Sequence, residues 1–265
     1  GPAGYGEDKM ISPSDRIDYK ILFENDPELA TAAAARVKIT CPLHENANPT
    51  TTFLGQYGFG NYIFEVPPMS TYYNTRHDLA DSLGVWVDVN AGIDVENNEM
   101  FWIFQSIDPE TGVAPVDTIG FLPVNDTLTG CGEGFVTFSV MCENDMITGD
   151  TISEQANIIF DDNDNILTNT YTNMFDAVPP TSVTVCDTLT VAYDNRIILK
   201  SLAQDDNGGS GIRQIDVYVN VDNTQYVLDG SMYPDTIGSV DTLSYSYRLG
   251  EGSLYQFIMQ AVDNV

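Results

Sequence analysis

The stretch Phe135–Asn173, FVTFSVMCENDMITGDTISEQANIIFDDNDNILTNTYTN, carries the strongest strand signal in the chain. In Phe135–Val140 every second residue is apolar, so one face of this run is almost purely hydrophobic. That period is typical of a half-buried strand. Two further runs, Gln155–Phe160 and Ile166–Asn173, are separated by the acidic turn Asp161–Asn165. The order predicts a three-stranded β-meander with an oxygen-rich turn.

The composition describes a folded, strongly acidic protein. Its 265 residues allow one large or two ordinary domains, and 43% hydrophobic residues exclude a disordered tail. With 39 acids against 10 bases the formal charge is −29, which repels phosphate backbones and anionic lipid. No apolar run reaches the roughly 18 residues of a membrane span. We therefore expect neither nucleic-acid binding nor membrane insertion.

Other runs along the chain repeat the strand period. Alternation is clear in Arg16–Asn25, Arg36–Thr40 and Leu83–Asn90, whereas Glu99–Ser106 is apolar on both faces, which predicts a central strand covered on both sides. The alanine-rich stretch Asp26–Ala35 fits either a short helix or a loop. No long amphipathic helix is visible. The fold class is therefore predicted to be all-β.

The pattern changes at Asp176–Pro180, where two prolines suit a domain junction. Short strands with turn signals follow to the end of the chain, which predicts a second, smaller β-sandwich. We therefore predict two β-sandwiches in tandem, at residues 13–178 and 179–265. Residues 1–12 are expected to be a linker that begins with Gly1-Pro2, which matches the remnant of a cleaved tag; no signal peptide is visible.

Several phrases, in order, resemble an uncharacterised β-sandwich repeat domain of very large secreted or surface-attached bacterial proteins. They include DYKILFEN, ATAAAARVKIT, FWIFQSIDPETGVAPVD, GEGFVTFSV and DAVPPTSV, within about residues 13–182. Cys41–His44 stands where that family has an Asp-Xaa-Leu-Asp type turn. The phrases DDNGGSGIRQIDVYVNVDN and LYQFIMQAVDNV resemble a fibronectin type III-like or bacterial immunoglobulin-like module, which implies that the last strand continues beyond Val265. The resemblance implies spacing, adhesion or display outside the cell, without catalysis.

The four cysteines, Cys41, Cys131, Cys142 and Cys186, have no CxxC spacing, so a zinc site is not expected. Cys131 and Cys142 bracket a strand that separates them by roughly 20 Å, too far for a disulfide. If two disulfides form, we expect Cys41–Cys142 and Cys131–Cys186, because an immunoglobulin-like strand order brings together the strand ends that precede Cys41 and Cys142. Unpaired buried thiols are the alternative.

Two sets of oxygen ligands are candidate Ca²⁺ sites. Asp161, Asn163 and Asn165 have the 1, 3, 5 spacing of a calcium loop, although Ile166 and Thr172 replace the glycine and the glutamate of an EF-hand. The alternative for this loop is a hairpin turn capped by its own Asx side chains.

The second set combines Asp176 at the junction, Asp205 and Asp206 in the QDDNGGSG turn, and Asp263 near the end of the chain. Related modules can gather such residues at one end of the sandwich, where Ca²⁺ would offset the repulsion between carboxylates and stiffen the two domains. The alternative is that each aspartate serves its own turn.

Aromatic residues offer a candidate glycan site. Trp86 is predicted on a polar face, and Tyr72 and Tyr73 are nearby in sequence, with Asp88 as a hydrogen-bonding partner. These could stack and hold a sugar ring. The alternative is that Trp86 packs under a loop or against the second domain.

Catalytic signatures are not apparent. The two histidines, His44 and His77, are far apart in sequence, and no nucleophile, metalloprotease or nucleotide-binding motif accompanies them. We expect a non-catalytic module of an extracellular or cell-surface bacterial protein, stiffened by Ca²⁺, with neighbouring modules of the same polypeptide as its partners. The alternative is a carbohydrate- or protein-binding module of a polysaccharide-degrading system, which would contact a glycan or a host or surface protein through the loops Tyr57–Arg76 and Asp108–Gly134.

Overall fold

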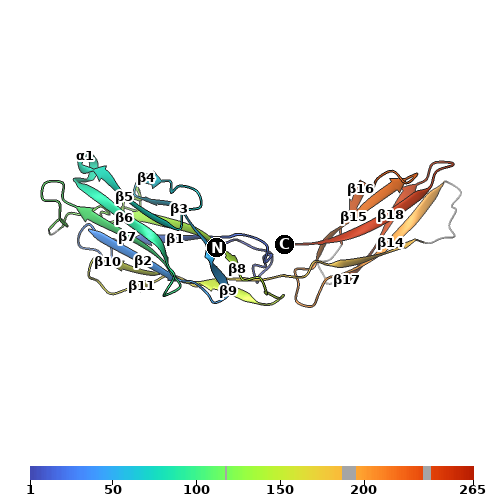
Figure 1. Ribbon diagram of the computed structural model, residues 1–265, viewed down its shortest axis with the longest axis horizontal. Coiled ribbons are helices and arrows are strands. Elements are labelled where there is room, and N and C mark those ends of the chain that lie inside the picture. Colours follow the sequence, from blue (N-terminus) through green and yellow to red (C-terminus); the bar gives the residue numbers. More distant parts are fainter. Residues whose placement is uncertain (117, 187–194, 235–239) are drawn as a thin grey trace. The chain divides into compact units, whose positions relative to one another are not determined.

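The computed structural model describes residues 1–116, 118–186, 195–234 and 240–265. These residues form an all-β protein, as predicted, and the helix α1 (Ala80–Leu83) is a single turn. The chain divides into two compact units (Figure 1). Unit 1 comprises Gly1–Pro2, Ser14–Asn144 and Thr151–Asn173, and unit 2 comprises Ala3–Pro13, Asp145–Asp150 and Met174–Val265. Unit 2 thus includes Ala3–Pro13, most of which was expected to be linker, and Asp145–Asp150, which was expected to be part of the first domain.

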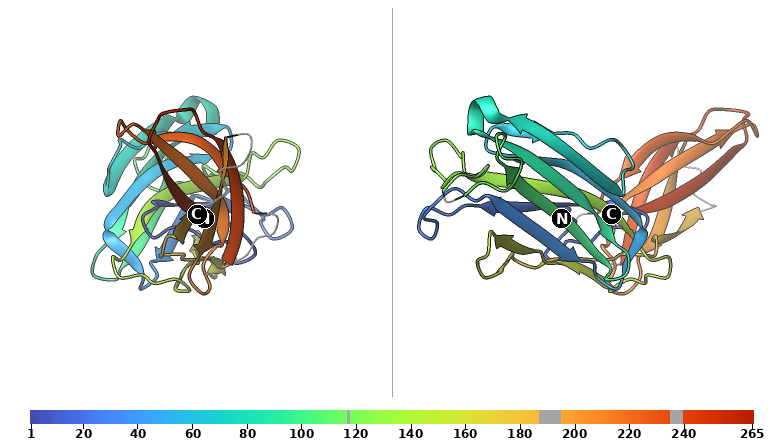
Figure 2. Two further views of the ribbon diagram at one scale, coloured as in Figure 1. Left: turned by 90° about the vertical axis from the view of Figure 1, so that its right-hand side faces the viewer. Right: turned by 60° about the vertical axis from the view of Figure 1, so that its left-hand side comes forward.

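Unit 1 is built from two large sheets and one small one (Figure 2). The four-stranded sheet contains, in spatial order, β1 (Ile17–Glu24), β8 (Glu133–Cys142), β3 (Ala47–Phe59) and β4 (Tyr62–Phe64). The six-stranded sheet contains β11 (Ile166–Leu167), β10 (Asn157–Phe160), β2 (Arg36–Pro42), β7 (Glu99–Ile107), β6 (Val85–Asp94) and β5 (Tyr72–Leu79). The strands β12 (Tyr171–Met174) and β9 (Thr151–Glu154) form a separate pair.

The two large sheets of unit 1 face each other across an aromatic core. Phe138 of β8 lies 5.7 Å from Trp102 of β7 between ring centroids, and Phe23 of β1 lies 5.9 Å from Phe104. All four side chains are at most 4% exposed. Burying a side chain of this kind contributes about 1.5–3 kcal/mol. The predicted alternation in Phe135–Val140 therefore supplies one wall of a sandwich core.

The predicted meander is wrong, although its strands exist. β8 pairs with β1 and β3 in the four-stranded sheet, whereas β10 pairs with β2 and β11 in the opposite sheet. Of the pairings that the predicted meander requires, only that between β10 and β11 is present. Alternation shows which face of a strand is buried, but the buried faces of both sheets have the same pattern, so it does not select a partner.

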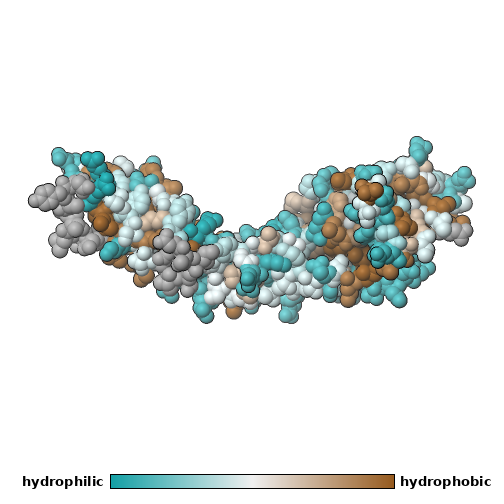
Figure 3. Space-filling model, turned by 180° about the vertical axis from the view of Figure 1, so that it is seen from behind, coloured by the Kyte–Doolittle hydropathy of each residue, from teal (hydrophilic) through white to brown (hydrophobic). Residues whose placement is uncertain are grey.

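Two other local expectations are refined. β7 is central in its sheet, but its residues alternate between buried and half-buried, so its outer face is not covered as we expected. Asp26–Ala35 forms a loop. Within the long loop, Phe121 and Leu122 belong to the core of unit 1, since they are at most 1% exposed and the Phe121 N–H donates to Ser106 Oγ at 2.9 Å. Figure 3, which colours one face of the molecule by hydropathy, shows apolar residues reaching the surface between hydrophilic ones.

Unit 2 contains two three-stranded antiparallel sheets. One orders β13 (Thr181–Cys186), β14 (Arg196–Gln204) and β17 (Val240–Arg248); the other orders β16 (Val227–Met232), β15 (Ile212–Val221) and β18 (Tyr255–Asp263). Their shared core consists of Leu199, Ala203, Ile212, Ile215, Val217, Met259 and Ala261. Within the residues that the structure describes, no helix has the length and hydropathy to cross a membrane.

The cysteines do not form the expected disulfides. Cys41, Cys131 and Cys142 are not in disulfides, so neither Cys41–Cys142 nor Cys131–Cys186 is present; the side chain of Cys186 lies outside the described residues. Cys41 is in β2 and Cys142 in β8, on opposite sheets. The Cys41 thiol donates instead to Glu154 Oε2 at 3.6 Å. The alternative of buried thiols outside any disulfide therefore applies to Cys41 and Cys142.

Glu154 is a buried acid in unit 1. It is 5% exposed, and besides the thiol it accepts the His44 N–H at 3.2 Å. Burial raises the pKa of Glu154 to about 7, which the two hydrogen bonds only partly offset. Because the folded pKa lies above the ordinary value, the neutral acid stabilises the fold at low pH. That contribution is lost as the pH rises through about 7.

We predict that Glu154→Gln removes a pH-dependent component of stability. Ionising Glu154 should cost unit 1 about 2–3 kcal/mol of unfolding free energy between pH 5 and pH 8. Urea unfolding of wild type and variant at both pH values measures it, with the exposed Glu96→Gln as the matched control. Equal pH dependence in wild type and Glu154→Gln would contradict the assignment.

Candidate metal centre

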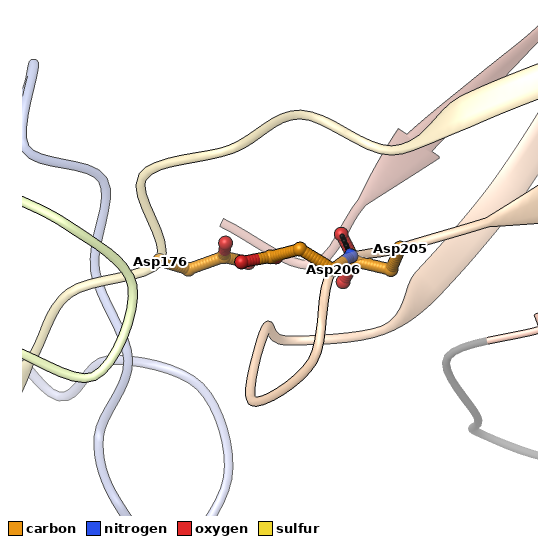
Figure 4. Close-up of side chains that lie close together, drawn as sticks. All are labelled: Asp176, Asp205 and Asp206. Atoms are coloured by element: carbon orange, nitrogen blue, oxygen red, sulfur yellow. Dashed lines mark hydrogen bonds between the residues drawn. The ribbon is translucent and has the colours of Figure 1, made fainter.

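Three aspartates of unit 2 come together at the end of a sandwich (Figure 4). Asp176 follows β12, while Asp205 and Asp206 open the turn between β14 and β15. One carboxylate oxygen from each lies within 4.8 Å of the others, and in the described part of the chain these are the only three or more acidic, histidine or cysteine residues so arranged. Sequence reasoning named all three.

Asp176 is held where three stretches of the chain meet. Its N–H donates to the Ile11 carbonyl at 3.0 Å, and the adjacent Ala177 N–H donates to Thr148 Oγ1 at 3.0 Å. Its own Oδ2 accepts the Ser210 N–H at 2.8 Å. The side chain is 3% exposed, and Oδ1 is buried without a hydrogen-bond partner. An unpaired buried carboxylate oxygen is costly unless a cation or water satisfies it.

The other two carboxylates are fixed by their own turn. Asp205, also 3% exposed, accepts the Gly211 N–H at 2.7 Å on Oδ2 and the Asp206 N–H at 3.0 Å on Oδ1. Asp206 Oδ1 is a second buried oxygen without a partner. The turn therefore orients both side chains through backbone groups and leaves one more oxygen unsatisfied.

Because Gly209 has no side chain, the carboxylates of Asp205 and Asp206 can lie close to its backbone. A Cβ atom at this position would lie 2.5 Å from Asp206 Oδ1 and 2.7 Å from Asp205 Oδ2. Both distances are shorter than van der Waals contact. The glycines of the QDDNGGSG turn thus include one whose missing side chain makes room for two oxygens.

Asp263, the fourth predicted ligand, is not one of the three clustered aspartates, although the charge of Asp176 acts on it. Burial raises the pKa of Asp263, the charge of Asp176 raises it further, and Arg213 counteracts the rise. Burial likewise raises the pKa of Asp205, and the charges of Asp176 and Asp206 add to it. Burial is the larger cause of both pKa shifts, and repulsion between carboxylates adds to it.

Ser210 and Asn264 support the site and were not predicted. Asn264 Nδ2 donates to the carbonyls of Ser210 and Gly211 at 2.9 and 3.0 Å, and the Asn264 N–H donates to Ser210 Oγ at 3.1 Å. These bonds lock the turn to the end of β18. The sequence gives one hint of the role of Asn264 in holding the turn: it is a polar residue directly after Asp263.

The donor set fits a hard divalent cation. Ca²⁺ takes six to eight oxygen ligands at about 2.3–2.6 Å, from carboxylates, carbonyls and water. Asp176 Oδ1 and Asp206 Oδ1 are unsatisfied oxygens of this kind, and a bound cation would offset the carboxylate repulsion that, after burial, contributes to the raised pKa of Asp205. The candidate Ca²⁺ ligands are therefore Asp176, Asp205 and Asp206, and the structure does not bring Asp263 into this group.

The acidic loop at Asp161–Asn165 is arranged differently. Asp161 Oδ1 accepts the N–H groups of Ala35 and Arg36 at 3.0 and 2.8 Å, so it anchors the start of β2. Asp161 has a left-handed backbone, with φ 50°, and Asn163 and Asn165 are exposed. Asp161 thus bonds a distant strand rather than the backbone of its own turn, and the loop does not gather its three predicted ligands around one point.

The predicted aromatic site is split between two faces of the six-stranded sheet. Tyr73 points inward and packs 6.3 Å from Tyr57, whereas Tyr72 is 59% exposed on the outer face. Trp86 is also on the outer face, but the Arg76 guanidinium lies 5.1 Å from its ring centroid. Asp88 holds that guanidinium through two bonds of 2.5 and 2.7 Å. A cation thus already covers one face of Trp86.

The two histidines have structural partners. His77 Nε2 lies 2.7 Å from the Tyr57 hydroxyl, and burial lowers its pKa. His44 Nδ1 accepts the Asn46 N–H at 3.2 Å.

Part of the chain matches a known family, but the description of that family names no activity. A family model described as a domain of unknown function, DUF7619, matches residues 86–174. No curated protein matches the chain. Function must therefore be argued from the residues and their geometry.

We predict that Gly209→Ala destabilises unit 2 by about 1–3 kcal/mol, because the new methyl group must displace Asp205 or Asp206. Denaturant unfolding measures the change. The exposed neighbour Asn207→Ala is the control within the same turn and should change stability by no more than about 0.5 kcal/mol. Equal effects of the two substitutions would contradict the close packing of the site.

Proposed function

We propose that this chain is a non-catalytic structural or adhesion segment of a large extracellular bacterial protein and that Ca²⁺ stiffens unit 2. The observation that carries the proposal is the Asp176–Asp205–Asp206 cluster, in which two buried oxygens have no partner. Catalysis would need a nucleophile, base or cofactor site, whereas this cluster offers oxygen ligands for a cation.

Bound calcium would link separate stretches of the chain inside unit 2. Asp176 lies in the segment after β12; its N–H donates to the Ile11 carbonyl, and the N–H of the adjacent Ala177 donates to Thr148 Oγ1. Asp205 and Asp206 belong to the turn before β15. A cation held by all three joins these separate stretches at one point. Without a cation, two carboxylates about 4 Å apart repel by about 4 kcal/mol at an effective dielectric constant of about 20.

The surface chemistry agrees with an extracellular setting. A charge of −29 keeps an extended protein soluble and discourages contact with nucleic acid. The resemblance to β-sandwich repeat and fibronectin type III-like modules supports a bacterial cell-surface or secreted location, and it makes neighbouring modules of the same polypeptide the expected partners. Millimolar extracellular Ca²⁺ suits a site of modest affinity.

We predict that Ca²⁺ raises the melting temperature of unit 2 and that EDTA reverses the rise. At a free concentration 100 times the Kd, ligand binding adds about 2.7 kcal/mol, which corresponds to roughly 10 °C for a domain of this size. Differential scanning calorimetry measures it. Asp206→Asn should remove most of the calcium increment and, because it removes one repelling charge, should not lower the melting temperature measured in EDTA.

Asp164→Asn is the matched control, since it makes the same charge change in the exposed loop Asp161–Asn165. It should leave the calcium increment intact. If Asp164→Asn removes the increment and Asp206→Asn does not, the cation belongs to that loop. If Ca²⁺ and EDTA give the same melting curve for wild type, the calcium part of the proposal fails.

A further inference from the structure

A cavity opens in unit 1 between the loop that follows β1 and the hairpin of β10 and β11. Its volume is about 480 Å³, and residues of both segments line it. That volume lies within the usual range for small-molecule sites. We call it the hairpin cavity. It belongs to unit 1, so it is separate from the calcium site of unit 2.

Backbone hydrogen bonds shape both walls of the hairpin cavity. On the loop side, the N–H groups of Leu29 and Ala30 donate to the Asp26 carbonyl at 3.1 and 2.8 Å. On the hairpin side, the Asn163 N–H donates to the Phe160 carbonyl at 3.0 Å. All five residues line the cavity. The walls are therefore turns of defined geometry.

Carboxylates lie on both walls, and none of the described lining residues is basic. Glu24 and Asp26 belong to the loop side and Asp164 to the hairpin side. Glu24 Oε1 accepts Asn125 Nδ2 at 2.7 Å, and Asp26 Oδ1 accepts the Glu28 N–H at 2.8 Å. Each of these two carboxylates keeps a second oxygen that can accept a donor from a ligand.

These carboxylates do not converge on a single metal ion. Within the described part of the chain, only the unit 2 cluster brings three acidic groups within 4.8 Å of one another, and Glu24, Asp26 and Asp164 are not among them. A small divalent ion needs its oxygen ligands close together. A larger cation whose charges are separated can contact acids on both walls.

The remaining lining is largely apolar. Leu29 and Ile166 are 76% and 48% exposed, and Phe160 and Ala30 also line the cavity. Exposed apolar side chains next to carboxylates suit a ligand that has methylene groups between its charges, because the methylene groups can cover them.

Asn25 adds a buried acceptor to the wall. The residue is 6% exposed, and its Nδ2 donates to the carbonyls of Ala32 and Leu122 at 3.0 Å each. Its Oδ1 accepts no hydrogen bond within the described chain, yet it is not one of the unpaired oxygens that the protein encloses. Because Nδ2 is held by the two carbonyls, Oδ1 opens onto the cavity that Asn25 lines. It is an open position for an N–H donor.

We propose that the hairpin cavity binds a linear alkyl diamine. One ammonium group donates to Asn25 Oδ1 and to the carboxylates of the loop side, and the other donates to Asp164. The methylene chain between them covers Leu29 and Ile166. This site adds a ligand-binding function to a module proposed above to be structural.

The chemistry of the lining selects a diamine over other ligands. An anion is repelled by the carboxylates, and a neutral sugar leaves them without a counter-charge. A single lysine side chain of a partner protein carries one ammonium group, so it satisfies one wall only. A diamine supplies a cation for each wall and an apolar middle.

Isothermal titration calorimetry of the full chain with 1,5-diaminopentane tests the proposal. Salt at about 0.15 M weakens contacts with the rest of the acidic surface, and millimolar Ca²⁺ occupies sites that prefer a metal ion. We expect one saturable site. Binding should be at least about tenfold tighter than that of n-pentylamine, which has the same chain with one charge, or of Mg²⁺, which has two charges and no chain.

Three variants locate the binding. Asp164→Asn should weaken diamine binding about three- to fivefold, because it removes the carboxylate of the hairpin wall. Asp162→Asn is the matched control, since it removes the same charge from an exposed residue of the same turn that does not line the cavity, and it should leave the affinity unchanged. Leu29→Ser should weaken binding about threefold without any change of charge.

Circular dichroism melts establish that each variant is folded. The proposal is overturned by the absence of saturable binding up to about 10 mM diamine or by equal affinities for the diamine and n-pentylamine. It is also overturned if Asp162→Asn and Asp164→Asn weaken binding equally, because the diamine would then respond only to the overall negative charge.

Discussion

The close approach of three aspartate carboxylates is the constraint on which unit 2 depends. Asp176, Asp205 and Asp206 lie within 4.8 Å of one another, and two of them are 3% exposed. Unit 2 is assembled from three separate stretches of chain, and the bonds from Asp176 and Ala177 to Ile11, Thr148 and Ser210 join them at this point. The polypeptide thus gathers negative charge where its separate stretches converge. A cation that neutralises this charge would remove the repulsion and link the stretches of chain that meet here.

The sequence predicted the members of this site better than its surroundings. Asp205 and Asp206 stand in a glycine-rich turn, and Asp176 marks the change of pattern at the two prolines, so local signals exposed all three. Ser210 and Asn264 carry no such signal, because their role comes from long-range bonds between a turn and the end of β18. The contribution of residues 3–13 and 145–150 is also a tertiary effect that no local pattern encodes.

For the fold too, features set by neighbouring residues could be predicted from the sequence, whereas contacts between distant segments could not. Period-two alternation predicted the buried faces of β1, β2, β6 and β8, and the all-β class followed from it. Strand partners did not follow, because both sheets of unit 1 bury equivalent apolar faces. The disulfide between Cys41 and Cys142 was predicted because an immunoglobulin-like strand order would bring their strand ends together, but the two strands belong to opposite sheets. Trp86 was correctly expected on a polar face, but Arg76 reaches it from the neighbouring strand.

The most direct test of the central claim is a crystal structure of the protein grown in millimolar Ca²⁺. The account predicts one strong density peak among Asp176 Oδ1, Asp205 and Asp206, at about 2.3–2.6 Å from its oxygen ligands. Carboxylates that turn apart toward solvent, with only water or nothing between them, would contradict it.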